Sequence, residues 1–128
     1  MNCLVVEKIK KLIKGYLKNT TENTCECYET QAIINKNKIN YILENTKYTI
    51  YIKENKIILI RENNEMKNIL TFSKNRSILS EYIIKENNLS VYIEIETIDY
   101  IIEENLIYIK YKVIDSNCIY EYKINIGG

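Results

Sequence analysis

Apolar and polar residues alternate along much of the second half of the chain. In residues 89–97, one face of an extended strand would carry Leu89, Val91, Ile93, Ile95 and Thr97. The same period of two recurs in residues 107–113 and in residues 118–126. This period is typical of strands that bury one face and expose the other. No helical period of 3.6 residues is found after residue 20.

Short runs rich in Asn, Lys and Glu separate the apolar segments. Examples are residues 35–38, 62–65, 86–88 and 115–117. The chain has no Pro and three Gly, and Asn suits turns in place of Gly because its short amide tolerates left-handed backbone conformations. This pattern predicts a meander of about nine or ten short antiparallel strands joined by tight turns.

The length of 128 residues fits a single domain with its own core. A meander of this length is expected to close into a barrel or fold into a sandwich, because closure removes exposed strand edges. We predict an all-β barrel of eight or more strands over residues 9–126. Residues 1–8 would lead into it, and residues 127–128 would form a short tail.

The first twenty residues carry a different pattern. The apolar residues of segment 4–18 follow helical spacing, with Lys on the other face, which favours a helix. Gly15 and the repeated Lys residues also permit a strand over residues 9–18. Periodicity alone leaves both possibilities open.

A series of short motifs between residues 40 and 126 resembles a known family. The motifs lie at residues 49–52, 58–61, 70–72, 93–97, 107–111 and 122–126, with Tyr41, Glu44 and Tyr82 between them. Their order is similar to that of the YwiB-like family of small uncharacterised bacterial proteins, whose fold resembles a lipocalin or calycin barrel. The chain departs from the family where Asn64, Asn75 and Asn87 or Asn88 replace Gly, and where Ile84 replaces Thr.

The resemblance implies a fold and no established activity. It implies an antiparallel meander closed as a lipocalin-like or calycin-like barrel. It also implies a strand near the N-terminus, so we expect a strand from about residue 9, with room for a short helical turn before it.

The composition excludes several classes of function. Eighteen basic and seventeen acidic residues leave a net charge of +1 with no basic cluster, which argues against nucleic-acid and membrane partners. The chain has no His and no glycine-rich phosphate loop. Glu94 and Glu96 fit a solvated strand face better than an acid–base pair. We therefore expect no catalytic residues and no cofactor.

The cysteines and the N-terminus bear on the compartment. The first residues do not resemble a signal peptide, and no apolar stretch is long enough to span a bilayer, so we expect a cytoplasmic protein. Cys25 and Cys27 could join Cys3 and Cys118 around a metal, but structural zinc pairs usually have two to four residues between the cysteines. Ordinary, half-buried thiols without a metal are the preferred interpretation.

Arg61 is the first candidate for a binding residue. It follows the apolar run 57–60, which predicts a central, covered strand with Ile57 and Leu59 on the same face as Arg61. A guanidinium placed there needs a carboxylate, backbone carbonyls or a bound anion. A structural ion pair with a Glu, or a head group that reaches water, would satisfy it equally.

Four further residues complete the candidate site. Tyr82 and Tyr111, like Tyr120 and Tyr122, lie on or beside apolar faces, where their rings would fill the core or their hydroxyls would orient a ligand. Tyr41 and Thr97 belong to the motifs that carry the family resemblance.

Two functions of different classes follow from these observations. The first is a non-enzymatic binding barrel for a small, partly apolar or anionic molecule, held by Arg61, Tyr82 and Tyr111. The alternative is a protein-interaction or structural module with a solid core, monomeric or homodimeric. Its partner would dock on an apolar outer patch built from outward tyrosines such as Tyr51, Tyr92 and Tyr108.

Overall fold

The computed structural model describes residues 8–127 and contains ten β-strands and no helix in that range. The all-β prediction is therefore confirmed. The strands are β1 (Ile9–Asn19), β2 (Thr24–Asn35), β3 (Lys38–Leu43), β4 (Thr46–Ile52), β5 (Ile57–Glu62), β6 (Met66–Phe72), β7 (Ser77–Ile84), β8 (Leu89–Glu103), β9 (Leu106–Val113) and β10 (Cys118–Ile126).

The strands form a closed antiparallel meander. Each strand pairs with the next along the chain, and β1 also pairs with β10. Every strand of the ring is therefore hydrogen-bonded to both of its neighbours. In the closing contact Ile13 lies opposite Ile126 and Asn19 lies opposite Tyr120. The predicted barrel of eight or more strands is confirmed, and it has ten.

Residues 9–19 form a strand, so the helical interpretation of segment 4–18 is wrong over this range. The apolar spacing favoured a helix, but β1 forms ladders with two neighbours, β2 and β10, and these pairings outweigh a weak local preference. The expected strand from about residue 9 is confirmed. The helical turn allowed before it falls largely in residues 1–7, outside the described residues.

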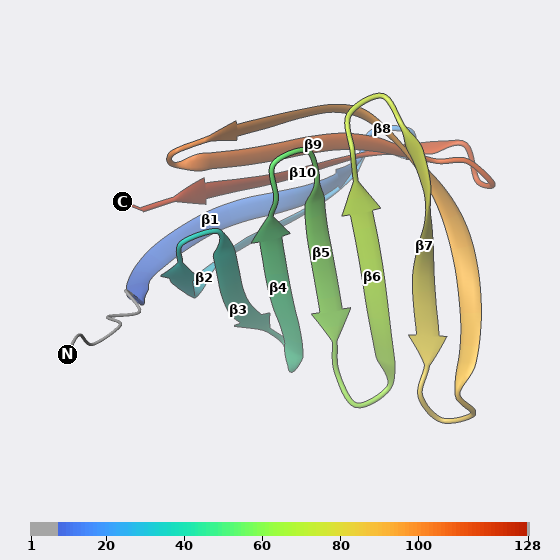
Figure 1. Cartoon of the computed structure of the whole chain (residues 1–128), viewed down its shortest axis with the longest axis horizontal. Coiled ribbons are helices and arrows are strands. Elements are labelled where there is room, and N and C mark those ends of the chain that lie inside the picture. The colour runs from blue at the N-terminus through green and yellow to red at the C-terminus, as the bar shows by residue number, and fades with distance from the viewer. Residues whose placement is uncertain (1–7, 128) are drawn as a thin grey trace.

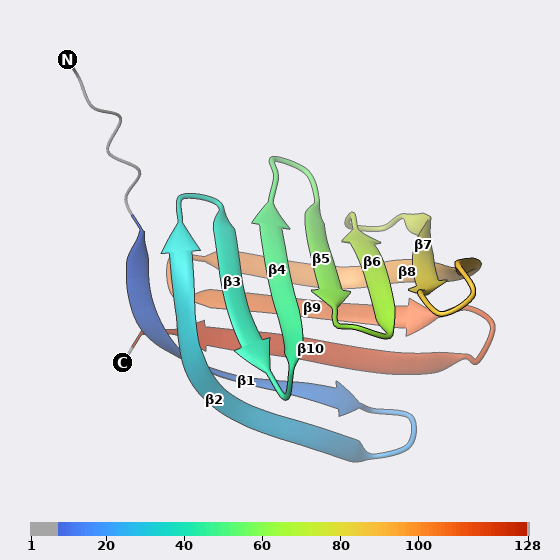
Figure 2. The ribbon, with the colours of Figure 1, turned by 90° about the horizontal axis from the view of Figure 1, so that it is seen from below.

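The barrel is flattened into two layers. Figure 1 and Figure 2 show β3 to β7 side by side in one layer, with β9 and β10 running across it in the other. The strands β1, β2 and β8 are the longest, with 11, 12 and 15 residues, and they bend between the layers. A register shift between Thr97 and Asp99 interrupts β8, and such bulges bend a strand and increase its twist.

The contact between β2 and β3 covers only a small part of β2. The two strands pair only from Ala32 to Asn35, whereas β2 pairs with β1 along its whole length. Figure 2 shows β2 bending away from β3 below these pairs. Residues 24–31 of β2 therefore have a neighbour on one side only.

The interior is filled by the inward faces of all ten strands. Fully buried side chains include Ile13, Ile39, Ile50, Ile57, Phe72, Ile95, Ile107, Ile109 and Ile124. The alternation predicted for residues 107–113 and 118–126 is confirmed, with Ile107, Ile109 and Tyr111 all buried on one face of β9.

Two expected dry faces are partly open. Leu89 and Val91 share the inward side of β8 with buried Ile95, yet they are 49% and 42% exposed, because the far end of the β7–β8 hairpin leaves its inner face in contact with water. On the outer face of β5, Ile58 and Ile60 are half-buried, so the strand is not covered on both faces as predicted.

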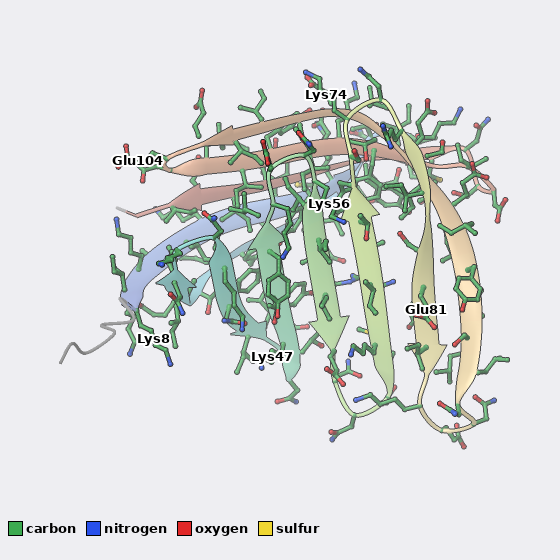
Figure 3. All side chains as sticks on the ribbon, viewed as in Figure 1. Lys8, Lys47, Lys56, Lys74, Glu81 and Glu104 are labelled. Atoms are coloured by element: carbon green, nitrogen blue, oxygen red, sulfur yellow. The ribbon has the colours of Figure 1, made fainter. Side chains whose placement is uncertain are left out.

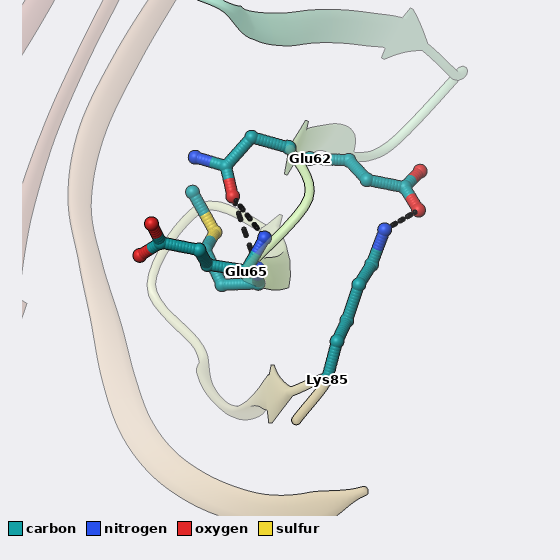
Figure 4. A network of polar contacts seen from close by, with 5 residues as sticks. Glu62, Glu65 and Lys85 are labelled. Carbon is teal, nitrogen blue, oxygen red and sulfur yellow. Dashed lines mark hydrogen bonds and ion pairs between the residues drawn. The ribbon is translucent and has the colours of Figure 1, made fainter. Parts of the chain in front are cut away.

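Asn residues support the turns in two different ways. Asn75 and Asn88 adopt positive φ angles of 62° and 54°, as their replacement of Gly predicted. Asn64 does not have a positive φ. In that turn the side chain of Asn63 instead accepts hydrogen bonds from the backbone N–H groups of Glu65 and Met66, at 2.8 and 3.0 Å. Figure 4 shows this turn beside the 2.8 Å ion pair between Lys85 and Glu62.

Charged side chains are concentrated on the outside. Lys56, Lys74 and Glu104, labelled in Figure 3, all lie in turns between strands. Among residues 8–127 there is no helix long and apolar enough to cross a membrane.

Gly15 in β1 is required by close packing and not by its backbone angles. A Cβ atom added there would lie 2.6 Å from the carbonyl oxygen of Lys123 and 2.7 Å from the ring of Tyr28, which crosses over the strand. Both contacts are shorter than a Cβ can tolerate, and one of them is with backbone.

We predict that Gly15→Ala lowers the free energy of unfolding by about 1–3 kcal/mol, the usual cost of overpacking a filled interior. Urea unfolding would measure it. The control is Lys10→Ala on the exposed start of the same strand, which should change stability little. A Gly15→Ala protein as stable as the control would show that Tyr28 does not pack over β1 as described.

Candidate functional site

A small cavity lies inside the barrel beside the partly paired β2 and β3 strands. Its volume is about 90 Å³. The apolar part of its wall comes from Leu17, Leu43, Leu59 and Leu70. The polar part comes from Glu26, Tyr28, Tyr48, Arg61, Tyr111 and Tyr122.

Arg61 projects into the interior from β5. It lies opposite Tyr48 on β4 and Asn68 on β6, and it shares its face with buried Ile57 and Leu59, as predicted. Its Nε and Nη2 groups donate hydrogen bonds to Oδ1 of Asn68, at 3.2 and 2.7 Å. Asn68 is itself buried, and its Nδ2 donates to the backbone carbonyl of Glu81 at 3.1 Å.

The positive charge of Arg61 has no anionic partner among residues 8–127. The ion pairs in this range join Lys14 to Glu29, Lys74 to Asp99 and Lys85 to Glu62. The structural alternative of an Arg61–Glu pair is therefore wrong within the described chain. The amide of Asn68 orients the guanidinium but does not neutralise it, and two of its five N–H donors are used in doing so.

Tyr111 presents a neutral hydroxyl to the same cavity. Its ring packs against Phe72 and Tyr120, with ring centres 5.0 and 5.3 Å away. Burial raises the pKa of Tyr111 to about 12, although the nearby charge of Arg61 acts in the opposite direction. Tyr111 therefore stays protonated at neutral pH and does not supply a counter-charge to Arg61.

Three more tyrosines form a chain of hydroxyl groups at the cavity wall. The hydroxyl of Tyr41 lies between those of Tyr28 and Tyr122 and is hydrogen-bonded to both, with 3.2 Å between the oxygens of Tyr28 and Tyr41. Burial raises the pKa of Tyr41 and Tyr122 well above the usual value. The three hydroxyl groups can donate three hydrogen bonds, and the two bonds among them use two of these donors. One O–H donor of the tyrosine chain therefore remains available.

The cavity opens where β2 separates from β3. Glu26 and Tyr28 lie in the part of β2 that has no β3 partner, and Leu43 and Tyr48 lie across the opening on β3 and β4. Glu26 is exposed, so its carboxylate lies at the mouth and in contact with water. The site thus combines a cationic group inside with an anionic group at its entrance.

The structure brings together some of the predicted site residues and separates others. Arg61 and Tyr111 line the cavity, and Tyr41 reaches it through its hydrogen bonds to Tyr28 and Tyr122. Tyr82 does not line it. Tyr82 is half-exposed on β7, and Asn68 on the intervening strand lies between it and Arg61.

Thr97 has a structural position away from the cavity. Its Oγ1 accepts a hydrogen bond from the backbone N–H of Ser73 at 3.2 Å, and its backbone bonds to Asn75 and Arg76. It therefore fixes the β6–β7 turn against the bulge of β8.

Sequence reasoning missed Glu26, Tyr28 and Tyr48. Tyr48 could have been found, because it lies two residues before buried Ile50 and so shares its face. Glu26 and Tyr28 follow from the split between β2 and β3, for which the sequence carries no recognisable signal.

The outward tyrosines do not form one patch. Tyr51 lies on β4, which neighbours neither β8 nor β9. Tyr92 and Tyr108 lie on the neighbouring strands β8 and β9, but Tyr108 pairs with Ile101 and Tyr92 lies outside the β8–β9 pairing. Tyr92 and Tyr108 donate hydrogen bonds to Glu81 and Glu121, and Lys38 and Lys53 lie over the ring of Tyr51.

Comparison with known proteins identifies a similar fold. The structure of the ywiB protein from Bacillus subtilis aligns with a TM-score of 0.69 at 14% sequence identity, covering 94% of this chain and 91% of that chain. No family model matches the sequence. A search of curated proteins also gives no match. The similarity therefore shows a YwiB-like fold, as the sequence motifs indicated, and at this identity it shows the fold alone.

The burial of Tyr111 predicts a loss of stability at alkaline pH. Its pKa is about 12 in the folded protein and near 10 when unfolded, so its stabilising contribution is complete below pH 10 and disappears as the pH rises through 12. Urea unfolding at pH 9 and at pH 11 would measure the free energy of unfolding that each protein loses between the two pH values. We expect this loss to be about 1 kcal/mol smaller in Tyr111→Phe than in the unsubstituted protein. Equal losses in the two proteins would contradict this assignment.

Proposed function

We propose that this protein is a non-enzymatic, calycin-like binding barrel that acts in the cytoplasm and holds a small carboxylate or similar anion at Arg61. The observation that carries the proposal is the unneutralised guanidinium in the cavity wall, fixed by Asn68 and without a carboxylate within 4.0 Å among residues 8–127. Arg61 is only half-buried, so water offsets part of the cost of its charge, and a bound anion would offset more of it.

The other groups of the cavity support an anionic ligand. Tyr111 and the spare O–H of the tyrosine chain are neutral donors, which would bind a carboxylate oxygen beside Arg61. The four leucines would contact an apolar portion of the same ligand. Burial raises the pKa of Tyr41 and Tyr122, so both hydroxyls stay protonated at neutral pH, and their chemistry suits hydrogen-bond donation to a ligand better than proton abstraction.

The size of the cavity limits the ligand to a few non-hydrogen atoms. A water molecule occupies about 30 Å³ in the liquid, so 90 Å³ corresponds to about three of them. Pockets for drug-sized ligands usually measure about 300–1,000 Å³. Acetate or propionate matches this interior, and a longer apolar chain would have to leave through the mouth beside Glu26.

We predict that propionate binds to the protein and that Arg61→Met weakens its binding about 10- to 100-fold. A charge-assisted hydrogen bond contributes about 1.5–3 kcal/mol, which corresponds to that range. Isothermal titration calorimetry would measure the affinity. The matched control is Arg76→Met, because Arg76 lies in the β6–β7 turn and outside the cavity lining.

Two outcomes of this titration would contradict the proposal. One is equal propionate affinity in Arg61→Met and Arg76→Met. The other is no binding of acetate or propionate to the unsubstituted protein while Arg61→Met is merely less stable. The second result would make Arg61 structural and favour the interaction-module alternative. Ile42 on β3 and Leu79 on β7, both 64% exposed, would then be the first side chains to test separately.

Glu26 provides an independent test of where the anion sits. Its carboxylate at the mouth repels an anion in the cavity, so Glu26→Gln should increase propionate affinity about two- to threefold at low ionic strength, and less in high salt. The control is Glu29→Gln on the same strand, whose carboxylate pairs with Lys14 and does not line the cavity. If both substitutions have the same effect, the anion does not bind beside Glu26.

A further inference from the structure

Cys25 and Cys27 form a close pair of thiols outside the cavity. Their sulfur atoms are 3.7 Å apart, and both side chains are exposed, which differs from the half-burial expected from the sequence. Cys118 is partly buried. The pair lies in the part of β2 that has no β3 partner, so one side of its strand is open.

Because side chains alternate along a strand, Cys25 and Cys27 project from the face opposite Glu26 and Tyr28. They lie beside Lys18 and Tyr16, their partners on β1. This face is the outside of the barrel. The thiol pair is therefore separate from the cavity that holds Arg61, and it is accessible from the solvent.

The sulfur separation fits two bonds to a single metal ion. With metal–sulfur bonds of about 2.3 Å, as in zinc sites, a tetrahedral angle at the metal places two sulfurs about 3.8 Å apart. A wider angle requires the sulfurs to move apart by less than about 1 Å, which exposed side chains achieve by rotation. The two thiols are thus already close to the spacing for joint coordination.

The number of ligands selects the kind of ion. Among residues 8–127 no group of three or more His, Cys, Asp or Glu side chains could hold a metal. Structural zinc sites need four protein ligands, whereas thiolates favour soft ions such as Cu(I), which accepts two. We propose that Cys25 and Cys27 together bind one soft monovalent cation of the Cu(I) type, coordinated by their two sulfur atoms.

Binding of the cation is balanced in charge and protons. Each thiol releases its proton and forms one metal–sulfur bond, so two protons leave for every Cu(I) bound, and no electron is transferred. The resulting bis-thiolate complex has a charge of −1. The ammonium group of Lys18, on the residue opposite Cys25, supplies a compensating positive charge.

A disulfide between the same residues is less well matched to the strand. Residues two apart in an extended strand have Cα atoms about 6.8 Å apart, which is the upper end of the range found for disulfides. The sulfurs would also have to approach from 3.7 Å to about 2.05 Å, which requires the strand to bend. Coordination of one ion needs no such change.

Anaerobic titration of the reduced protein with Cu(I), in competition with a chromophoric Cu(I) chelator, tests the proposal. We expect one tight Cu(I) per chain, and at least a 100-fold loss of affinity in both Cys25→Ser and Cys27→Ser, because one thiol alone loses the chelate. The controls are Cys3→Ser and Cys118→Ser, which should remain within about threefold of the unsubstituted protein. Because the thiols of Cys25 and Cys27 are exposed, circular dichroism should show that Cys25→Ser and Cys27→Ser are folded.

Three results would overturn the proposal. The first is a loss of Cu(I) affinity in Cys3→Ser or Cys118→Ser equal to that in Cys25→Ser. The second is Cu(I) binding by the unsubstituted protein that is no tighter than binding by Cys25→Ser or Cys27→Ser. The third is an X-ray absorption spectrum that shows three sulfur neighbours at the bound copper. A spectrum with two sulfur neighbours at the bound copper would support it.

Discussion

The mismatch in length between neighbouring strands β2 and β3 is the constraint on which both sites depend. Strand β2 pairs with β1 along its full length, but β3 is half as long and pairs with β2 over only four residues. Closure through β1 and β10 keeps the barrel intact in spite of this gap. One consequence is the mouth between Glu26, Tyr28, Leu43 and Tyr48, and the other is an open edge beside Cys25 and Cys27.

The chemistry of the interior follows from one charge among neutral groups. Arg61 is oriented by Asn68, and Tyr111 and Tyr122 stay protonated because burial raises the pKa of both. The interior therefore offers several donors and a positive charge but no negative charge of its own to satisfy them. The leucines restrict the remaining space to about 90 Å³. Together these features favour a small anion over either a lipid or a cation.

The sequence predicted the strands much better than the site. Period-two alternation located the buried faces of β9 and β10, because each of these strands has one dry face. It placed Arg61 beside Ile57 and Leu59 for the same reason. It did not distinguish Tyr82 and Thr97, which lie outside the cavity, from Arg61 and Tyr111, because a strand pattern identifies a face but not how far along the barrel a cavity extends. The role of Asn68 as the partner of Arg61 depends on the β5–β6 register, which no local pattern specifies.

A crystal structure of the protein grown with propionate would show whether Arg61 binds an anion inside the barrel. We expect carboxylate density in the cavity, within hydrogen-bond distance of the guanidinium of Arg61 and of at least one tyrosine hydroxyl. Density for water alone in the cavity at saturating propionate, or an Arg61 head group turned out to the solvent, would contradict it.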